Sequence, residues 1–140
     1  MFNSGFNILC PLIGTALLTS ILIGCSGKPV TAQEAKPISL DRQFAYSEND
    51  EATLVVTRDK GGYEGKGTIH VDFSIDGKPA ASIRPREVVK FGLKAGTYIL
   101  GVSIKGSPVV EREVTLKAGD VTRRRITYYN NLDITPTAFK

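Results

Sequence analysis

The sequence lacks tryptophan and contains one histidine, His70, and two cysteines, Cys10 and Cys25. Zinc and iron–sulfur sites are built mainly from sets of histidine and cysteine ligands. A chain with so few of these residues cannot assemble such a set by itself. We therefore expect no metal ion and no cofactor in this protein.

Charged side chains are absent from the first 24 residues. Within this stretch, residues 8–23 form an almost wholly apolar run that Pro11 and Gly14 interrupt. A helix needs about 20 apolar residues to span a bilayer, whereas the apolar region of a secretory signal peptide needs about 7 to 15. The run therefore favours a signal peptide at residues 1–24, and export of the chain, over a permanent transmembrane helix.

The apolar run ends in Leu22-Ile23-Gly24-Cys25, just where the composition turns polar. Taken alone, Cys25 could be an ordinary thiol or could pair with Cys10. The four residues resemble the lipobox of bacterial lipoprotein precursors. The resemblance implies cleavage before Cys25, a diacylglyceryl group on its sulfur and often an acyl chain such as palmitate on its amine. Two or three chains anchor a protein stably, since burial contributes about 0.8 kcal/mol per CH₂.

The residue after this cysteine bears on the cellular address. Inner-membrane lipoproteins of enteric-type bacteria carry aspartate at this position, and this chain has Ser26. The resemblance therefore implies a lipid-anchored protein of the bacterial outer membrane that faces the periplasm.

Basic side chains exceed acidic ones modestly, since 18 Lys and Arg against 14 Asp and Glu give a formal net charge of +4. Because these charges are scattered along the chain, they favour anionic neighbours without predicting a nucleic-acid partner. Residues 25–50 are rich in Pro, Ser, Gln, Glu and Lys without a steady period, which predicts a flexible tether. Within it, Ile38, Leu40, Phe44 and Tyr46 alternate and could dock as an edge strand.

From Ala52 onward, apolar side chains recur at every second residue, which is typical of strands with one buried face. The Asp76-Gly77 dipeptide predicts a two-residue hairpin turn, because such a turn needs positive φ at both positions. No segment carries a helical stripe of useful length. About seven short strands without helices predict an all-β fold, an antiparallel β-sandwich over residues 51–140, with a small open barrel as the alternative.

Two short segments repeat, "LKAGTY" at residues 93–98 and "LKAGDV" at residues 116–121. Each closes one strand with Leu and opens the next after Gly, so we interpret both as hairpin turns reused within one pair of sheets.

A longer run, residues 75–106, resembles the PEGA-type β-sandwich modules found in bacterial lipoproteins of unknown function, although the Pro-Glu-Gly-Ala signature itself is absent. The matching positions are Asp76, Gly77, Lys78, Leu93, Gly96, Tyr98, Leu100 and Val102. These are turn and core positions, so the resemblance implies an immunoglobulin-like sandwich and supplies no catalytic residue.

The glycine-rich stretch at residues 60–68, "KGGYEGKGT", superficially looks like a phosphate-binding loop. The P-loop motif fails here, because Lys60 stands where its first glycine belongs and Gly67 stands where Ser or Thr belongs. We interpret the stretch as a loop between strands, with Tyr63 and Lys66 as candidate contact residues.

His70, the only histidine, falls by alternation on the solvent-facing side of its strand. No nucleophile motif such as G-x-S-x-G accompanies it. We therefore expect a surface histidine and no catalytic residues.

Three consecutive arginines, Arg123, Arg124 and Arg125, fall within a predicted strand. Arginine side chains grip phosphate and carboxylate groups with two hydrogen bonds, so these residues are a candidate anion-binding site. The alternative is an exposed edge strand whose charges prevent edge-to-edge aggregation, and we favour this alternative.

Together these patterns predict a membrane-anchored envelope lipoprotein without enzymatic activity. Its sandwich would act as a binding or structural module for an envelope protein, a glycan such as peptidoglycan, or an anionic lipid. A small envelope hydrolase is the alternative function.

Overall fold

The structure is a computed structural model that describes residues 29–61 and 69–140. The predicted signal peptide at residues 1–24 and the lipidation site Cys25 lie outside the described residues. The predicted contact residues Tyr63 and Lys66 also lie outside them. The fold and the candidate sites below concern the described part of the chain.

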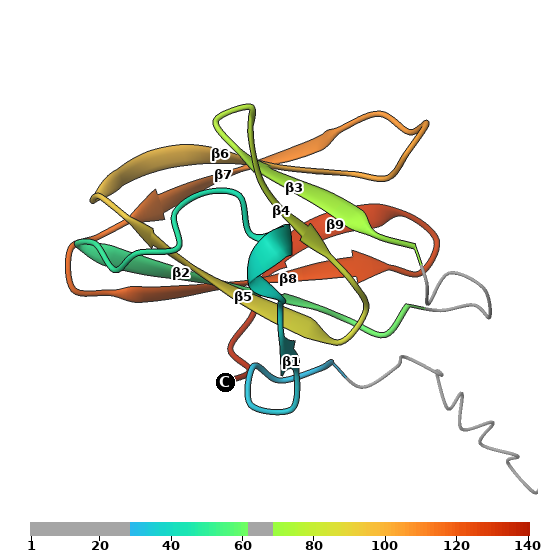
Figure 1. The fold of residues 1–140 in the computed structure, drawn as a ribbon, viewed down its shortest axis with the longest axis horizontal. Helices are drawn as coiled ribbons and strands as arrows, with labels where there is room; N and C mark the ends of the chain where they lie inside the picture. The colour runs from blue at the N-terminus through green and yellow to red at the C-terminus, as the bar shows by residue number, and fades with distance from the viewer. Residues whose placement is uncertain (1–28, 62–68) are drawn as a thin grey trace, which may run out of the picture.

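The described chain forms an all-β sandwich of two packed sheets, as predicted, with nine strands where about seven were expected. Sheet A has the order β1-β5-β2-β8-β9, and sheet B has the order β4-β3-β6-β7. In Figure 1, β3, β6 and β7 lie above β2, β5 and β8. The strands are β1 (Lys36–Pro37), β2 (Ala52–Arg58), β3 (Val71–Ile75), β4 (Lys78–Ile83), β5 (Glu87–Leu93), β6 (Gly96–Ser103), β7 (Val110–Leu116), β8 (Val121–Tyr128) and β9 (Leu132–Pro136), and a 3-10 helix, η1, spans Leu40–Arg42.

The alternating apolar side chains of the two sheets meet in one core between the layers. At its centre the rings of Phe73 from β3 and Phe91 from β5 stack across the sheets, with centroids 5.3 Å apart and an interplanar angle of 14°. Such a contact contributes beyond the area that the rings bury. The other buried members include Leu54, Val56, Ile75, Ile83, Leu93, Leu100, Val102, Leu116, Ile126 and Ile134. Period-two alternation thus identifies the core face correctly.

The hairpin turn predicted at Asp76-Gly77 is confirmed. Both residues have positive φ, 50° and 73°, and β3 and β4 pair directly on either side of them. The Asp76 carboxylate also accepts a hydrogen bond from the Ile99 N–H at 2.8 Å, which ties the turn to β6.

The interpretation of the two repeated "LKAG" segments as hairpins is wrong. The first joins β5 of sheet A to β6 of sheet B, and the second joins β7 of sheet B to β8 of sheet A. Both turns contact Glu51: its carboxylate accepts the Ala95 N–H at 3.0 Å, and its carbonyl accepts the Gly119 N–H at 2.7 Å. Alternation in the sequence predicts where a strand ends, but it does not predict which sheet the next strand joins.

Strand β8 is not an edge strand, contrary to the favoured interpretation of its arginines. It lies between β2 and β9 in sheet A. Its pairing with β2 is parallel, and so is the short pairing of β1 with β5, whereas the other strand pairs are antiparallel. The charges on β8 therefore need another explanation.

The segment predicted to form a tether packs against the sandwich over much of its described length. Val30 and Ala35 are buried in a second apolar cluster with Val55 and Val88, on the outer face of sheet A. Farther along, the chain crosses β5 so closely that a Cβ added to Gly92 would lie 1.8 Å from the Glu48 carbonyl oxygen. A few well-placed contacts hold this segment despite its polar composition.

Candidate functional site

The start of the described chain is fastened to the sandwich by Asp59, which follows β2 and is buried. Its Oδ1 accepts the Val30 N–H at 3.1 Å, and its Oδ2 lies 3.4 Å from Arg125 Nε. Burial raises the pKa of Asp59, and the contacts with Val30 and Arg125 only partly offset this effect. Asp59 thus holds the start of the described chain, at Val30, against the folded domain.

A second fastening joins η1 to β5 through a two-pronged ion pair. Arg42 donates from Nη1 to Glu87 Oε2 at 2.7 Å and from Nη2 to Glu87 Oε1 at 2.6 Å. Arg42 also donates to the Ser82 carbonyl at 2.9 Å, and Glu87 accepts the Arg84 N–H at 2.8 Å. This pair is largely buried, so its geometry positions the N-terminal segment closely.

The three arginines of β8 do not form one site, because Arg124 lies on the inward face and Arg125, on the outer face with Arg123, is paired with Asp59. Arg124 is in register with inward-facing Val56, donates to the Arg123 carbonyl at 3.1 Å, and has its pKa lowered by burial. Arg125 faces Asp59. Only Arg123 lies on an open part of the outer face of sheet A, in register with Val55.

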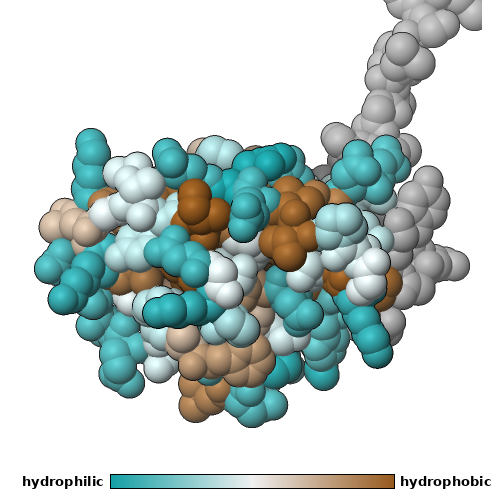
Figure 2. Space-filling model, turned by 90° about the horizontal axis from the view of Figure 1, so that it is seen from above, coloured by the Kyte–Doolittle hydropathy of each residue, from teal (hydrophilic) through white to brown (hydrophobic). Residues whose placement is uncertain are grey.

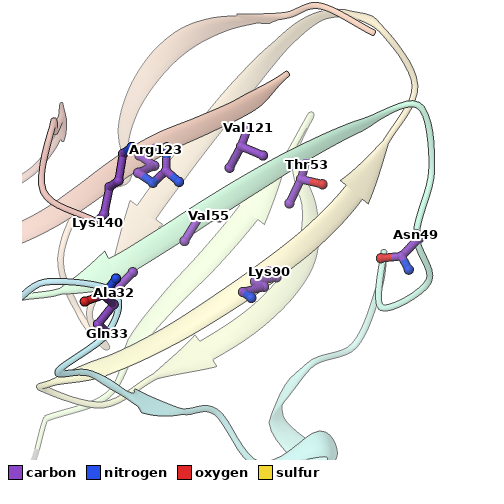
Figure 3. A pocket seen from close by; sticks show the side chains of 9 residues that line it. All are labelled: Ala32, Gln33, Asn49, Thr53, Val55, Lys90, Val121, Arg123 and Lys140. Atoms are coloured by element: carbon purple, nitrogen blue, oxygen red, sulfur yellow. The ribbon is translucent and has the colours of Figure 1, made fainter. Parts of the chain in front are cut away.

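A groove of about 480 Å³ lies on this outer face, between the N-terminal segment and the C-terminal end of the chain (Figure 3). Figure 1 shows the two chain segments together beneath sheet A. Among the nine described residues that line the groove, three are cationic and none is acidic. They are Ala32, Gln33, Asn49, Thr53, Val55, Lys90, Val121, Arg123 and Lys140. We call this feature the cationic groove.

Sequence reasoning identified Arg123 and missed the other two cations of the groove, Lys90 and Lys140. Alternation could have placed Lys90 on the outer face of its strand. Lys90 lies near Arg123 only because β2 pairs with both β5 and β8. The sequence pattern does not reveal these pairings.

His70 lies between two polar partners beside the end of sheet B. Its Nδ1 is 3.1 Å from Ser82 Oγ, and its Nε2 accepts a hydrogen bond from Arg84 Nε at 2.8 Å. A neutral imidazole has one donor and one acceptor nitrogen, so the proton resides on Nδ1 and is directed at Ser82. In this arrangement the imidazole cannot take a proton from the Ser82 hydroxyl, which is what a general base would have to do.

Arg58 is a buried cation that the sequence did not single out, and it closes one end of the core. The side chain is only 1% exposed and donates from Nη1 to the carbonyls of Ile69 and Ile83. Burial lowers its pKa to about 10, and Glu87 partly opposes this effect. At neutral pH the side chain therefore remains charged and bridges the two sheets.

A second hollow of about 430 Å³ lies where the β6–β7 and β8–β9 turns meet. Its lining is apolar and amide-bearing, with Pro108, Tyr128, Asn130 and Leu132 among its members. It gathers no charged side chain from the described residues, so it offers less chemistry than the cationic groove.

In the described ranges, no group of three or more His, Cys, Asp and Glu side chains converges on a metal-ion site. Nor does any helix within those ranges have the length and apolar character needed to cross a membrane. Comparison with protein-family models and with curated proteins finds no match to this chain.

Proposed function

We propose that this chain is a bacterial envelope lipoprotein, anchored through Cys25, whose β-sandwich serves as a binding or structural module without catalytic activity. The observation that carries the proposal is the sequence from Leu22 to Cys25, at the end of an uncharged apolar run. The proposal includes a location at the outer membrane facing the periplasm and a PEGA-like character of the sandwich.

The fastening of the N-terminal segment supports an anchor that holds the sandwich close to a membrane. Val30 is pinned to Asp59, and Cys25 precedes it by only five residues. An extended chain spans at most about 3.6 Å per residue, so the acylated cysteine can lie no more than about 18 Å from Val30. The module therefore works at the membrane surface rather than at the end of a long tether.

The polar arrangement around His70 supports a binding role over the alternative of a small hydrolase. A hydrolytic serine needs a neighbouring base that removes its proton. In a catalytic triad, a carboxylate accepts a hydrogen bond from the histidine nitrogen that faces away from the serine. In this protein Arg84 donates to that nitrogen of His70, and the proton on the other nitrogen faces Ser82. Ser82 and His70 are best explained as a polar surface cluster that joins β4 to the start of β3.

The test is the mass of the N-terminal peptide from protein extracted from bacterial membranes. We expect a peptide that begins at Cys25 and carries two or three acyl chains, and a Cys25→Ala variant that keeps its leader and gains no lipid. An unmodified Cys25, or a chain that still begins at Met1 without acylation, would refute the anchor. Separation of inner from outer membranes by density then tests the cellular address.

A further inference from the structure

We propose that the cationic groove docks on anionic phospholipid head groups of the membrane to which the chain is anchored. This inference rests on the proposed function, because it assumes that Cys25 holds the sandwich at a membrane. It adds to that function a specific surface, centred on Lys90 and Arg123, and an orientation of the sandwich on the bilayer.

The centre of the groove is a row of three residues on adjacent strands. Val55 of β2 is in register with Lys90 of β5 on one side and with Arg123 of β8 on the other. Figure 3 shows Val55 between Lys90 and Arg123, with Lys140 beside Arg123. Neighbouring strands are about 4.8 Å apart, so the two cations rise from backbones about 10 Å apart, a span that their long side chains close around a phosphate group.

The two central cations are available to a ligand. None of the three ion pairs formed among the described residues involves Lys90 or Arg123. The apolar side chain of Val121 also lines the groove and is 48% exposed. A site with paired cations and exposed apolar surface matches the boundary between lipid phosphates and acyl chains.

The groove lies on the same outer face of sheet A as Val30, which is five residues from the proposed anchor Cys25. The Val30 N–H is hydrogen-bonded to Asp59. Val55 precedes Asp59 by four residues, so their backbones are about 13 Å apart at the rise of a strand. Cys25 can lie up to about 18 Å from Val30. The anchor and the groove can therefore reach the same membrane surface together.

The strands of sheet B carry exposed acidic side chains on the opposite face of the sandwich. Asp72 of β3 and both Glu111 and Glu113 of β7 are exposed there, because their neighbours Val71, Phe73 and Val114 point into the core. Figure 2 looks onto this side and shows a largely hydrophilic surface with apolar side chains in separate groups. These acidic side chains make the outer face of sheet B a less favourable surface for an anionic bilayer than the cationic groove.

Because the lipid anchor already holds the protein at the membrane, a low affinity of the groove for anionic lipid is enough to orient the sandwich. A single cation near an anionic surface raises binding about fivefold, and salt screens this attraction over about 10 Å. A tethered domain meets the surface at a high effective concentration. A contact that recruits the free protein only at low salt therefore still orients an anchored one at physiological salt.

The test uses the chain from residue 26, because both sheets and both apolar clusters lie between Val30 and Pro136. This anchor-free protein is sedimented with vesicles of phosphatidylcholine alone or mixed with phosphatidylglycerol, at low salt. We expect binding only with phosphatidylglycerol. The K90Q/R123Q variant should bind about 25-fold more weakly, since two cations are removed.

The matched control is K78Q/K105Q, which removes the same charge from two exposed lysines outside the groove, Lys78 in β4 and Lys105 between β6 and β7. This variant should bind nearly as well as the unaltered chain. Equal loss in both variants, or equal binding to vesicles of phosphatidylcholine alone, would overturn the proposal. So would NMR shifts at Lys90 and Arg123 with inorganic phosphate but no binding to vesicles. Because the tested chain lacks Cys25, its result is independent of the lipidation test, and each proposal can fail alone.

Discussion

The ion pair between Arg42 and Glu87 should be among the costliest contacts to break. Arg42 donates two hydrogen bonds to Glu87, and the two side chains are only 13% and 9% exposed. In R42A the carboxylate keeps the Arg84 N–H and loses both charged donors. Removing one partner of a buried pair costs about 3–5 kcal/mol, and the residual exposure here places the loss near 3 kcal/mol. This is a large share of a domain's stability, which is typically about 5–15 kcal/mol.

Urea unfolding followed by far-ultraviolet circular dichroism measures this loss. The double variant R42M/E87L removes both charges and should recover at least half of the loss, because no buried charge is left without a partner. A cost below about 1 kcal/mol for R42A, or additive costs in the full cycle of single and double variants, would show that the pair is effectively solvated.

The same pair predicts how stability depends on pH. Burial disfavours the charged form of Glu87, but the hydrogen bonds from Arg42 and Arg84 outweigh it and lower the pKa below its usual 4.5. The stabilisation is therefore fully present above about pH 4.5 and is lost as the pH falls through the lower pKa of the folded state. The gap in unfolding free energy between the unaltered chain and E87Q should narrow over that acidic range. A gap that stays constant down to pH 3 would contradict the assignment.

Three further changes test the core and the N-terminal segment. Phe91→Ala removes half of the stacked ring pair and should cost about 3–5 kcal/mol in urea unfolding. Gly92→Ala should lower the free energy of unfolding by at least about 3 kcal/mol, because the added Cβ would collide with the Glu48 backbone. Gly101→Ala should cost less, because its Cβ would meet the Ser74 hydroxyl, which can move. Asp59→Ala removes the acceptor of the Val30 N–H. A glutamate-specific protease should therefore cleave after exposed Glu34 faster than in the unaltered chain. Equal cleavage rates would show that this hydrogen bond is not needed to hold the N-terminal segment.

The strands were predictable because alternation is a local property of the sequence. The Asp76-Gly77 turn was predictable for the same reason, since its backbone conformation depends on the two residues themselves. The pairing of strands that are distant in the sequence was not predictable. The crossing turns after Leu93 and Leu116, and the parallel pairing of β2 with β8, depend on contacts between residues far apart in the chain.

The candidate site was less predictable than the fold. Composition predicted a tether at residues 25–50, but specific contacts of Arg42 and Val30 hold much of its described part. The arginine run identified one groove residue, Arg123. Of the other two arginines, Arg124 donates a hydrogen bond to the Arg123 carbonyl and Arg125 pairs with Asp59. A charge pattern shows which residues are cationic, whereas only the sheet order shows which of them face the same space.

The parallel pairing of β2 with β8 also bears on how an exported chain would reach its native state. β2 is the first long strand to be made, and its two neighbours in sheet A are β5 and β8, the latter close to the end of the chain. The centre of sheet A therefore cannot close until nearly the whole polypeptide has appeared, and such long-range pairing is intrinsically slow. A chain that must cross a membrane in an extended form gains from this order, because its topology delays folding until passage is almost complete.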